Sequence, residues 1–174
     1  MIFKTKWGWV GLAATDRGVR TIVLPKPTRR AVERELMSGG LMAGEGGRRA
    51  VPLPAETNMA VQHGRAARTA IMAYLQGRAR SFDVPLDLEG QPGFRVKVWK
   101  VLQSIPYGRV RSYGWVARKV GKPRAARAIG GACGANPVPL LVPCHRVIAG
   151  DGSLGGFSGG LSSKKRLLKL EGAI

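Results

Sequence analysis

The segment Val84–Gly93 (VPLDLEGQPG) separates two halves of the chain that differ in character. Proline and glycine at this density break both helices and strands, so the segment is typical of a connection between compact units. A chain of 174 residues is long enough for one ordinary domain or two small ones. We therefore predict an N-terminal structural domain over residues 1–84 and a C-terminal domain over residues 85–174.

The first half is predicted to be a small sheet with a helix. The stretch Ile2–Trp9 alternates loosely, and Val19–Leu24 is rich in β-branched residues and stops before a proline, as strands do. The stretch Ala60–Gly77 has a helical pattern. Between them, Ser38–Arg49 is rich in glycine and is expected to be a mobile loop, whose role stays open.

The second half carries more helix signals. Apolar residues in Val96–Leu102 recur at helical spacing. A serine can cap a helix over Ser112–Val120, Gly121 then makes a turn, and a second helix over Pro123–Ala135 begins with a well-placed proline. Two short helices joined by such a turn outline a helix-turn-helix, although plain helical domains contain the same outline.

The charge balance points to a polyanionic partner. The chain holds 29 Lys and Arg against 10 Asp and Glu, which gives a net charge of +19 and a pI near 11.4. Nucleic acid is the commonest partner of so basic a chain. A cationic surface that serves only solubility is the alternative.

The second predicted helix is unsuited to reading bases. Side chains that read base edges are long and polar, whereas this helix has one such residue at its centre, Arg127. Its other positions are small: Ala125, Ala126, Ala128, Gly130 and Gly131. Such a surface suits sequence-independent binding in a minor groove, with the arginine reaching into the base stack. The small residues equally suit tight packing against a neighbouring helix.

The segment LVPCHRVI joins a nucleophile to a base. A thiol attacks well only as the thiolate, which His145 or Arg146 could promote next to Cys144. Neighbouring side chains of an extended chain point to opposite faces, so we expect His145 to act through a water, held by a third group. Glu171 is a candidate for that group, although an exposed charge at the end of the final helix, Ser162–Glu171, is the simpler interpretation.

Several other kinds of site are not indicated. Two cysteines, Cys133 and Cys144, make no disulfide framework, and the N-terminus fails as a signal peptide, so a reducing cytoplasm is the expected location. No apolar run is long enough to span a bilayer. With His63 as the only other histidine and no CxxC spacing, neither a zinc site nor a cysteine hydrolase is expected.

Four motifs together resemble one family. IPYGRVRSYG, RAIGGACGANP, PCHRVI and SGGLSSKKRLLKLEG follow one another closely, and the chain over Phe94–Gly172 resembles the O6-alkylguanine-DNA alkyltransferases. Weaker similarity extends over Ile2–Leu88. The resemblance implies an α+β fold, with a ribonuclease H-like N-terminal sheet and helix and a helical C-terminal domain whose helix-turn-helix accompanies the active-site cysteine.

The resemblance also implies a role for each residue of the catalytic group. Cys144 would accept the alkyl group, with His145 as the water-linked base and Glu171 as the carboxylate that orients it. Tyr113 would give a proton to N3 of the leaving guanine, and Asn136 would be the hinge between the recognition helix and the active-site strand.

The remaining implied residues bind DNA or the base. Arg127 would fill the gap left by a flipped base, next to the small residues of the same helix. Ser158 and Gly159 lie in a loop that would close over the base, and the carbonyl of Val147 would accept its exocyclic amine. Cys133 has no family role, and we interpret it as a small buried residue.

These roles imply stoichiometric repair of alkylated double-stranded DNA, independent of sequence, by a monomer without cofactor or metal. The N-terminal half has no cysteine, unlike relatives that hold zinc there. Whether binding is cooperative and whether O4-alkylthymine is accepted stay open. Three alternatives compete: a lesion-binding relative, which would lack Cys144, a thiol hydrolase or redox protein, and an architectural minor-groove protein, which would leave PCHR without a purpose.

Overall fold

The computed structural model describes residues 1–38 and 57–174. They form two compact units, Met1–Glu89 (unit 1) and Gly90–Ile174 (unit 2), each with its own core. The predicted loop Ser38–Arg49 lies, apart from its first residue, outside the described residues. No helix in the described ranges combines the length and the apolar character that crossing a bilayer would need.

Unit 1 is built on a three-stranded antiparallel sheet in the order β1-β2-β3. The strands are β1 (Ile2–Thr5), β2 (Gly8–Thr15) and β3 (Gly18–Lys26). The prediction of one strand over Ile2–Trp9 is therefore wrong, because the chain turns within it. The Thr5 hydroxyl accepts from the Trp7 backbone N–H and donates to the Gly8 carbonyl, which closes the turn.

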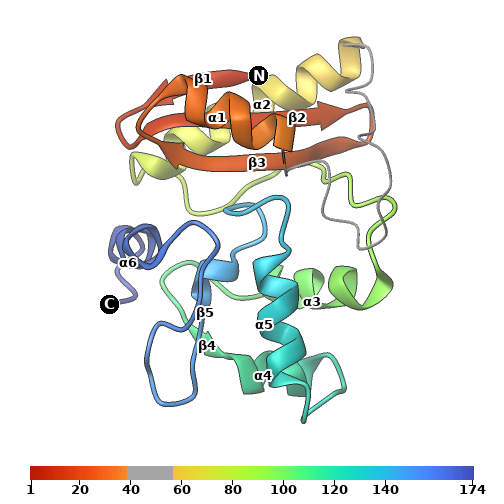
Figure 1. Cartoon of the computed structure of the whole chain (residues 1–174), viewed down its shortest axis with the longest axis vertical. Coiled ribbons are helices and arrows are strands. Elements are labelled where there is room, and N and C mark those ends of the chain that lie inside the picture. Colours follow the sequence, from red (N-terminus) through yellow and green to blue (C-terminus); the bar gives the residue numbers. More distant parts are fainter. Residues whose placement is uncertain (39–56) are drawn as a thin grey trace. The chain divides into compact units, whose positions relative to one another are not determined.

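One helix covers each face of this sheet. Successive residues of a strand point to opposite faces, and Gly11 and Leu12 of β2 meet different helices. A Cβ on Gly11 would lie 2.4 Å from Cγ1 of Val32 in α1 (Arg29–Ser38), whereas Leu12 packs near Gly64 of α2 (Asn58–Leu75). The sheet lies between α1 and α2 in Figure 1, so glycine at position 11 is what lets α1 approach closely.

Helix α1 was not predicted from the sequence, although its signals are present. The Thr28 hydroxyl accepts from the Ala31 N–H as an N-cap, and Arg29 pairs with Glu33 one turn later. Val32, with no exposed surface, faces the sheet. Helix α2 was predicted, and the structure places its ends at Asn58 and Leu75, with Thr57 as its N-cap.

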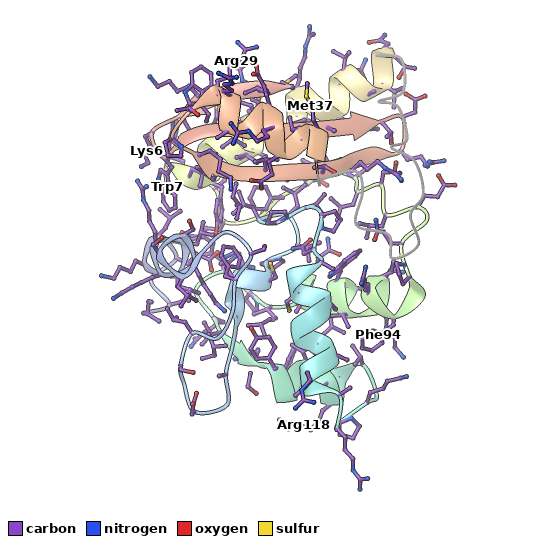
Figure 2. The ribbon with its side chains drawn as sticks, viewed as in Figure 1. Lys6, Trp7, Arg29, Met37, Phe94 and Arg118 are labelled. Atoms are coloured by element: carbon purple, nitrogen blue, oxygen red, sulfur yellow. The ribbon has the colours of Figure 1, made fainter. Side chains whose placement is uncertain are left out.

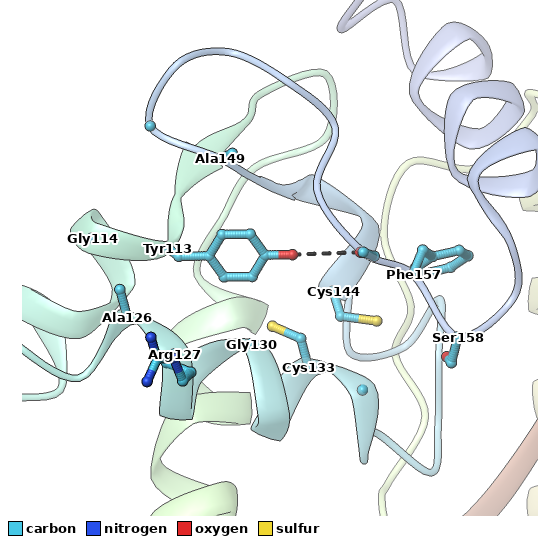
Figure 3. Close-up of a pocket in the computed structure, with 13 residues that line it drawn as sticks. Tyr113, Gly114, Ala126, Arg127, Gly130, Cys133, Cys144, Ala149, Phe157 and Ser158 are labelled. Carbon is cyan, nitrogen blue, oxygen red and sulfur yellow. Dashed lines mark hydrogen bonds between the residues drawn. The ribbon is translucent and has the colours of Figure 1, made fainter.

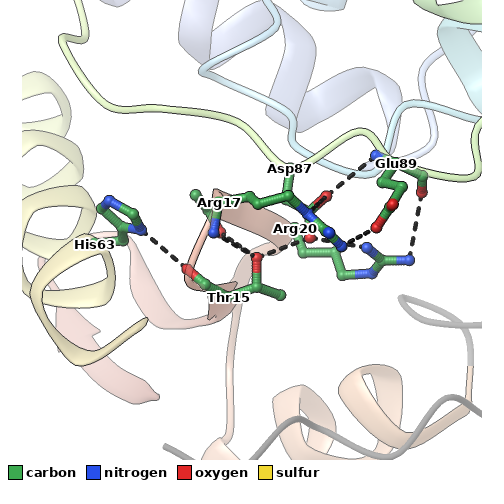
Figure 4. Close-up of polar contacts among 7 residues, drawn as sticks. Thr15, Arg17, Arg20, His63, Asp87 and Glu89 are labelled. Atoms are coloured by element: carbon green, nitrogen blue, oxygen red, sulfur yellow. Dashed lines mark hydrogen bonds and ion pairs between the residues drawn. The ribbon is translucent and has the colours of Figure 1, made fainter. Parts of the chain in front are cut away.

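The first residues of the turn-rich segment after position 84 form backbone hydrogen bonds with the sheet of unit 1, so they are not a free linker. The Val19 N–H donates to the Pro85 carbonyl and the Asp87 N–H donates to the Val19 carbonyl, at 2.8 and 2.9 Å. The buried Asp87 carboxylate accepts from Thr15, Arg17 and Arg20 (Figure 4). Unit 1 consequently ends at Glu89, a few residues beyond the predicted boundary.

Unit 2 is mainly helical. Its elements are α3 (Gly93–Gln103), β4 (Arg111–Ser112), α4 (Tyr113–Lys119), α5 (Ala126–Gly134), a 3-10 turn η1 (Cys144–Arg146), β5 (Val147–Ile148) and α6 (Leu161–Leu170). Strands β4 and β5 form a short parallel pair. The fully buried Trp99 of α3 donates from its indole N–H to the Ala132 carbonyl at 2.8 Å, which fixes α5 against α3.

The predicted helix pair is present with one changed boundary. Ser112 caps α4 by accepting from the Trp115 N–H at 3.1 Å, as expected. Helix α5 begins at Ala126 rather than at Pro123, because the Ala125 N–H bonds to the Lys122 carbonyl and makes a separate turn.

Long basic side chains such as Lys6, Arg29 and Arg118 point outward from the ribbon (Figure 2), as is usual for charged residues.

Candidate active site

Cys144 stands at the end of a tightly held loop. The Asn136 side chain organises this loop: its amide donates to the Val142 carbonyl at 2.8 Å and to Cys144 Sγ at 3.2 Å, and its oxygen accepts from the Val138 N–H. Leu140 has a φ of 76°, a left-handed conformation that costs energy for a branched side chain. Asn136 and the strained loop thus set the position of the sulfur.

The chain turns at the cysteine. The extended chain expected before the cysteine is not present, because the chain turns at Leu140 and the Val142 N–H bonds to the Val138 carbonyl. Cys144, His145 and Arg146 then form the 3-10 turn η1, with the Arg146 N–H bonded to the Pro143 carbonyl. All three side chains are buried. The turn sends Cys144 to one cavity and aims His145 and Arg146 at the end of α6.

Glu171 is the centre of a buried ionic cluster. Its side chain has no exposed surface and accepts from His145 Nε2 at 2.9 Å and from Arg146 Nη2 at 2.8 Å. Its second oxygen accepts from Arg146 Nε and from the Gly108 N–H. The interpretation of Glu171 as an exposed charge is therefore wrong. Arg146 forms an ion pair with this carboxylate and donates a hydrogen bond to the Ile105 carbonyl. Its guanidinium therefore stabilises the ionic cluster rather than the thiol.

The cluster fixes the state of His145. A carboxylate only accepts hydrogen bonds, so Nε2 carries the ring hydrogen and Nδ1 carries the basic lone pair. Burial lowers the pKa of His145 below its ordinary value, and Glu171 only partly opposes this. The positive charges of Arg146 and Lys164 lower the pKa of His145 further. His145 is consequently a neutral imidazole that can take up a proton.

This state predicts how stability depends on pH. Unfolded, His145 binds a proton below about pH 6.5, whereas folded it does so only at lower pH. The unfolded state then holds more protons in that window, so the free energy of unfolding falls as pH drops below about 6.5, by up to about 1.4 kcal/mol per pH unit. Urea unfolding between pH 5 and 8 should show this fall in the wild type and a flatter curve in His145→Gln. Parallel curves would contradict the assignment.

A cavity of about 660 Å³ opens beside Cys144 in unit 2 (Figure 3). This volume is within the range of small-molecule sites. The lining comes from four places, α4, α5, the η1 turn and the loop before α6: Tyr113, Gly114, Ala126, Arg127, Gly130, Cys133, Gly134, Cys144, Ala149, Gly150, Gly156, Phe157 and Ser158. Most of these side chains are apolar or absent, so the walls of the cavity are mainly apolar.

Burial keeps the thiol of Cys144 and the hydroxyl of Tyr113 in their protonated forms. Burial raises the pKa of the Cys144 thiol, and the Asn136 hydrogen bond and the charge of Lys164 only partly oppose it. The thiolate expected from the sequence is therefore not the resting form, and the buried thiol needs a base at the moment of reaction. Burial likewise raises the pKa of Tyr113, whose hydroxyl donates to the Gly156 carbonyl at 3.4 Å.

Sequence reasoning missed Lys164. Its side chain is fully buried, and Nζ donates to the carbonyls of Val147 at 2.6 Å, Gly156 at 3.3 Å and Leu154. It thereby ties the cavity loop to β5, and its charge acts on Cys144. The signal was available: Lys164 shares a helical face with Leu167 and Leu168, so it belongs to the inner face of α6.

Six of the thirteen predicted site residues line the cavity. Cys144, Tyr113, Arg127 and Ser158 line it together with Ala126 and Gly130. The other seven, which the structure also describes, are not part of this lining: His145, Asn136, Glu171, Ala125, Ala128, Val147 and Gly159. The Val147 carbonyl instead accepts from Lys164. In residues 1–38 and 57–174, no three His, Cys, Asp or Glu side chains gather as metal ligands would.

Comparisons with known proteins agree on one family. The family model of the 6-O-methylguanine DNA methyltransferase DNA-binding domain matches residues 93–173. A methylated-DNA–protein-cysteine methyltransferase of Mycolicibacterium paratuberculosis is 52% identical over 99 residues, 57% of this chain and 59% of the relative, so the match spans less than two thirds of that protein. One of Methanosarcina barkeri is 44% identical over 125 residues, 72% of this chain and 78% of the relative.

A solved structure extends the likeness to both units. The crystal structure of Mycobacterium tuberculosis OGT in complex with DNA is 33% identical with a TM-score of 0.74, and the match covers 99% of this chain and 91% of that one. On this coverage and identity, the chain belongs to the methylated-DNA–protein-cysteine methyltransferase family.

Proposed function

We propose that this protein repairs DNA by transferring the alkyl group of O6-alkylguanine in a duplex to Sγ of its own Cys144. The observation that carries the proposal is the buried thiol in an apolar cavity, with the basic imidazole of His145 next to it in the chain and Arg127 at the cavity's exposed helix. An architectural minor-groove protein would have no use for a buried thiol in such a cavity. A lesion-binding relative would lack the thiol.

The target base must leave the helix before it can react. The alkyl carbon on O6 is buried in a duplex, so in-line attack requires extrusion of the nucleotide into the cavity. A damaged guanine pairs poorly, which lowers the cost of its extrusion. Arg127 is exposed on α5, where it can fill the vacated position in the stack.

The transfer then balances with residues of this chain. The Cys144 thiol gives its proton through a water to Nδ1 of His145, and the sulfur attacks the alkyl carbon as the bond from that carbon to O6 breaks. The guanine takes the electron pair of the broken bond and receives a proton at N3 from Tyr113. The proton that His145 took up then replaces the one that Tyr113 lost. The product is a thioether, which is not a leaving group, so each protein reacts once.

Unit 2 supplies the DNA-binding surface in this proposal. Helices α4 and α5 and the turn between them would act as a helix-turn-helix, with Ala126, Ala128 and Gly131 exposed for close approach to a minor groove. About half of the 29 Lys and Arg side chains belong to unit 2, against two carboxylates. Binding would be independent of sequence. For unit 1 we propose a ribonuclease H-like fold with a structural role, which its antiparallel sheet and helices support.

Mass spectrometry tests the proposal directly. The protein is incubated with a stoichiometric amount of duplex carrying one O6-methylguanine, and its tryptic peptides are weighed. We expect one methyl group on the peptide that contains Cys144, and none on Cys144→Ser, which should still bind the duplex. An intact lesion, or repeated turnover by one protein molecule, would refute the proposal.

Arg127→Ala should separate base extrusion from chemistry. Without the side chain that fills the stack, single-turnover repair of duplex DNA should be roughly 10-fold slower. This factor corresponds to about 1.4 kcal/mol, a part of the few kcal/mol that extrusion of the base costs. The reaction with free O6-benzylguanine should barely change. Arg124→Ala, which removes the same charge from an exposed position nearby, is the control for general electrostatics. Equal losses on both substrates would contradict the role of Arg127.

A further inference from the structure

The cavity contains a second thiol that the proposed chemistry does not use. Cys133 of α5 is 8% exposed and lines the same cavity as Cys144 (Figure 3). The helix that carries it is anchored one residue earlier, where the Ala132 carbonyl accepts from Trp99. The position of this thiol relative to the cavity is therefore fixed by a buried hydrogen bond.

Cys133 is the largest inward group on its part of α5. The cavity-lining neighbours on this helix, Ala126, Gly130 and Gly134, have one side-chain carbon or none. A Cβ on Gly130 would come 4.0 Å from Tyr113, and one on Gly134 would meet no described atom within 4 Å. Arg127, the other long side chain, is exposed at the surface. The sulfur of Cys133 thus forms the wall that α5 presents to the cavity.

This wall is electrically neutral. Burial, followed by the charge of Cys144, raises the pKa of Cys133 to about 12, and Lys164 lowers it only in part. A neutral buried thiol behaves as a small hydrophobic group. It is therefore a surface for an apolar substituent to pack against, and a poor competitor of Cys144 as the acceptor.

We propose that Cys133 determines the size of alkyl group that the site accepts. Its sulfur packs against the group on O6 while Cys144 attacks that group, and a short side chain here leaves room for substituents as large as benzyl. The inference rests on the proposed function and deepens it, because it assigns a class of larger, apolar alkyl lesions to the same cavity. The bond that forms and the bond that breaks are unchanged.

The test compares two substrates in a set of variants whose side chains at position 133 differ in size. Wild type, Cys133→Ala, Cys133→Ser and Cys133→Leu are reacted in single turnover with duplexes that carry O6-methylguanine or O6-benzylguanine. One methylene in an apolar pocket changes discrimination by roughly 10- to 200-fold. We therefore expect Cys133→Leu to lower the benzyl-to-methyl rate ratio at least about 10-fold. Cys133→Ala, which widens the cavity, should raise the benzyl-to-methyl ratio, and Cys133→Ser, close in shape, should keep the wild-type ratio.

The design keeps the possible failures apart. The same ratio shift with the free alkylated bases would confirm that the effect lies in the cavity and not in DNA binding. A ratio within about twofold of wild type in both Cys133→Leu and Cys133→Ala would overturn the inference, as would an alkyl group found on Cys133. If wild type left both lesions intact, the proposed function itself would fail. Should Cys133→Leu not fold, Cys133→Ala still decides through the opposite shift.

Discussion

Replacing Glu171 with alanine is expected to destabilise unit 2 by about 3–5 kcal/mol and to abolish alkyl transfer. The change leaves the Arg146 guanidinium buried without its carboxylate, and an unbalanced buried charge is among the most destabilising defects in a protein. It also removes the group that holds the hydrogen on Nε2 of His145, so Nδ1 loses its defined role as the base. Urea unfolding and single-turnover transfer measure the two losses.

Two companion variants show which loss is chemical. Glu171→Gln retains the size and one acceptor oxygen but not the charge, so it should fold better than Glu171→Ala and still transfer slowly. Asp151→Ala removes the only other carboxylate of unit 2, which is exposed, and should leave both the unfolding midpoint and the transfer rate unchanged. A Glu171→Ala protein as stable as wild type would show that the ionic cluster is not what holds α6 to η1.

Replacing Lys164 with methionine is expected to slow transfer by roughly 10-fold or more. Methionine fills similar space but cannot donate to the carbonyls of Val147, Leu154 and Gly156, and a hydrogen bond to a charged group is worth about 1.5–3 kcal/mol. The loop that lines the cavity then loses its tie to β5. The neutral side chain also no longer opposes the rise of the Cys144 pKa.

A pH profile distinguishes this positioning role from a simple loss of structure. Loss of the cation raises the pKa of Cys144 further, so the rate of reaction with free O6-benzylguanine should reach its plateau at a higher pH in Lys164→Met than in wild type. Lys165→Met, which removes a neighbouring exposed lysine, should keep the wild-type profile and rate. A slower Lys164→Met with an unshifted profile would restrict the role of Lys164 to holding the loop.

Local signals predicted local structure well. The serine cap of α4, the amphipathic pattern of α6 and the strand over Val19–Leu24 depend on neighbouring residues, and the structure agrees with each. Where the prediction failed, a local hydrogen bond had turned a short segment of the chain. Thr5 turns the chain between β1 and β2, and the turn at Lys122 delays the start of α5. Helix α1 also carries local signals, the Thr28 cap and the Arg29–Glu33 pair, although no helix was predicted there.

The sequence by itself determined the chemistry available to this protein: one Cys-His pair, a small-residue helix with one arginine, and a strongly positive charge. The tertiary structure alone decided which groups meet. Glu171 reaches His145 and Arg146 across 25 or more positions, and Lys164 reaches the loop and β5, because burial makes charged groups pair with whatever partners the packing brings within reach. No spacing rule encodes such long-range contacts, so the state of the thiol and of its base emerges only from the folded unit.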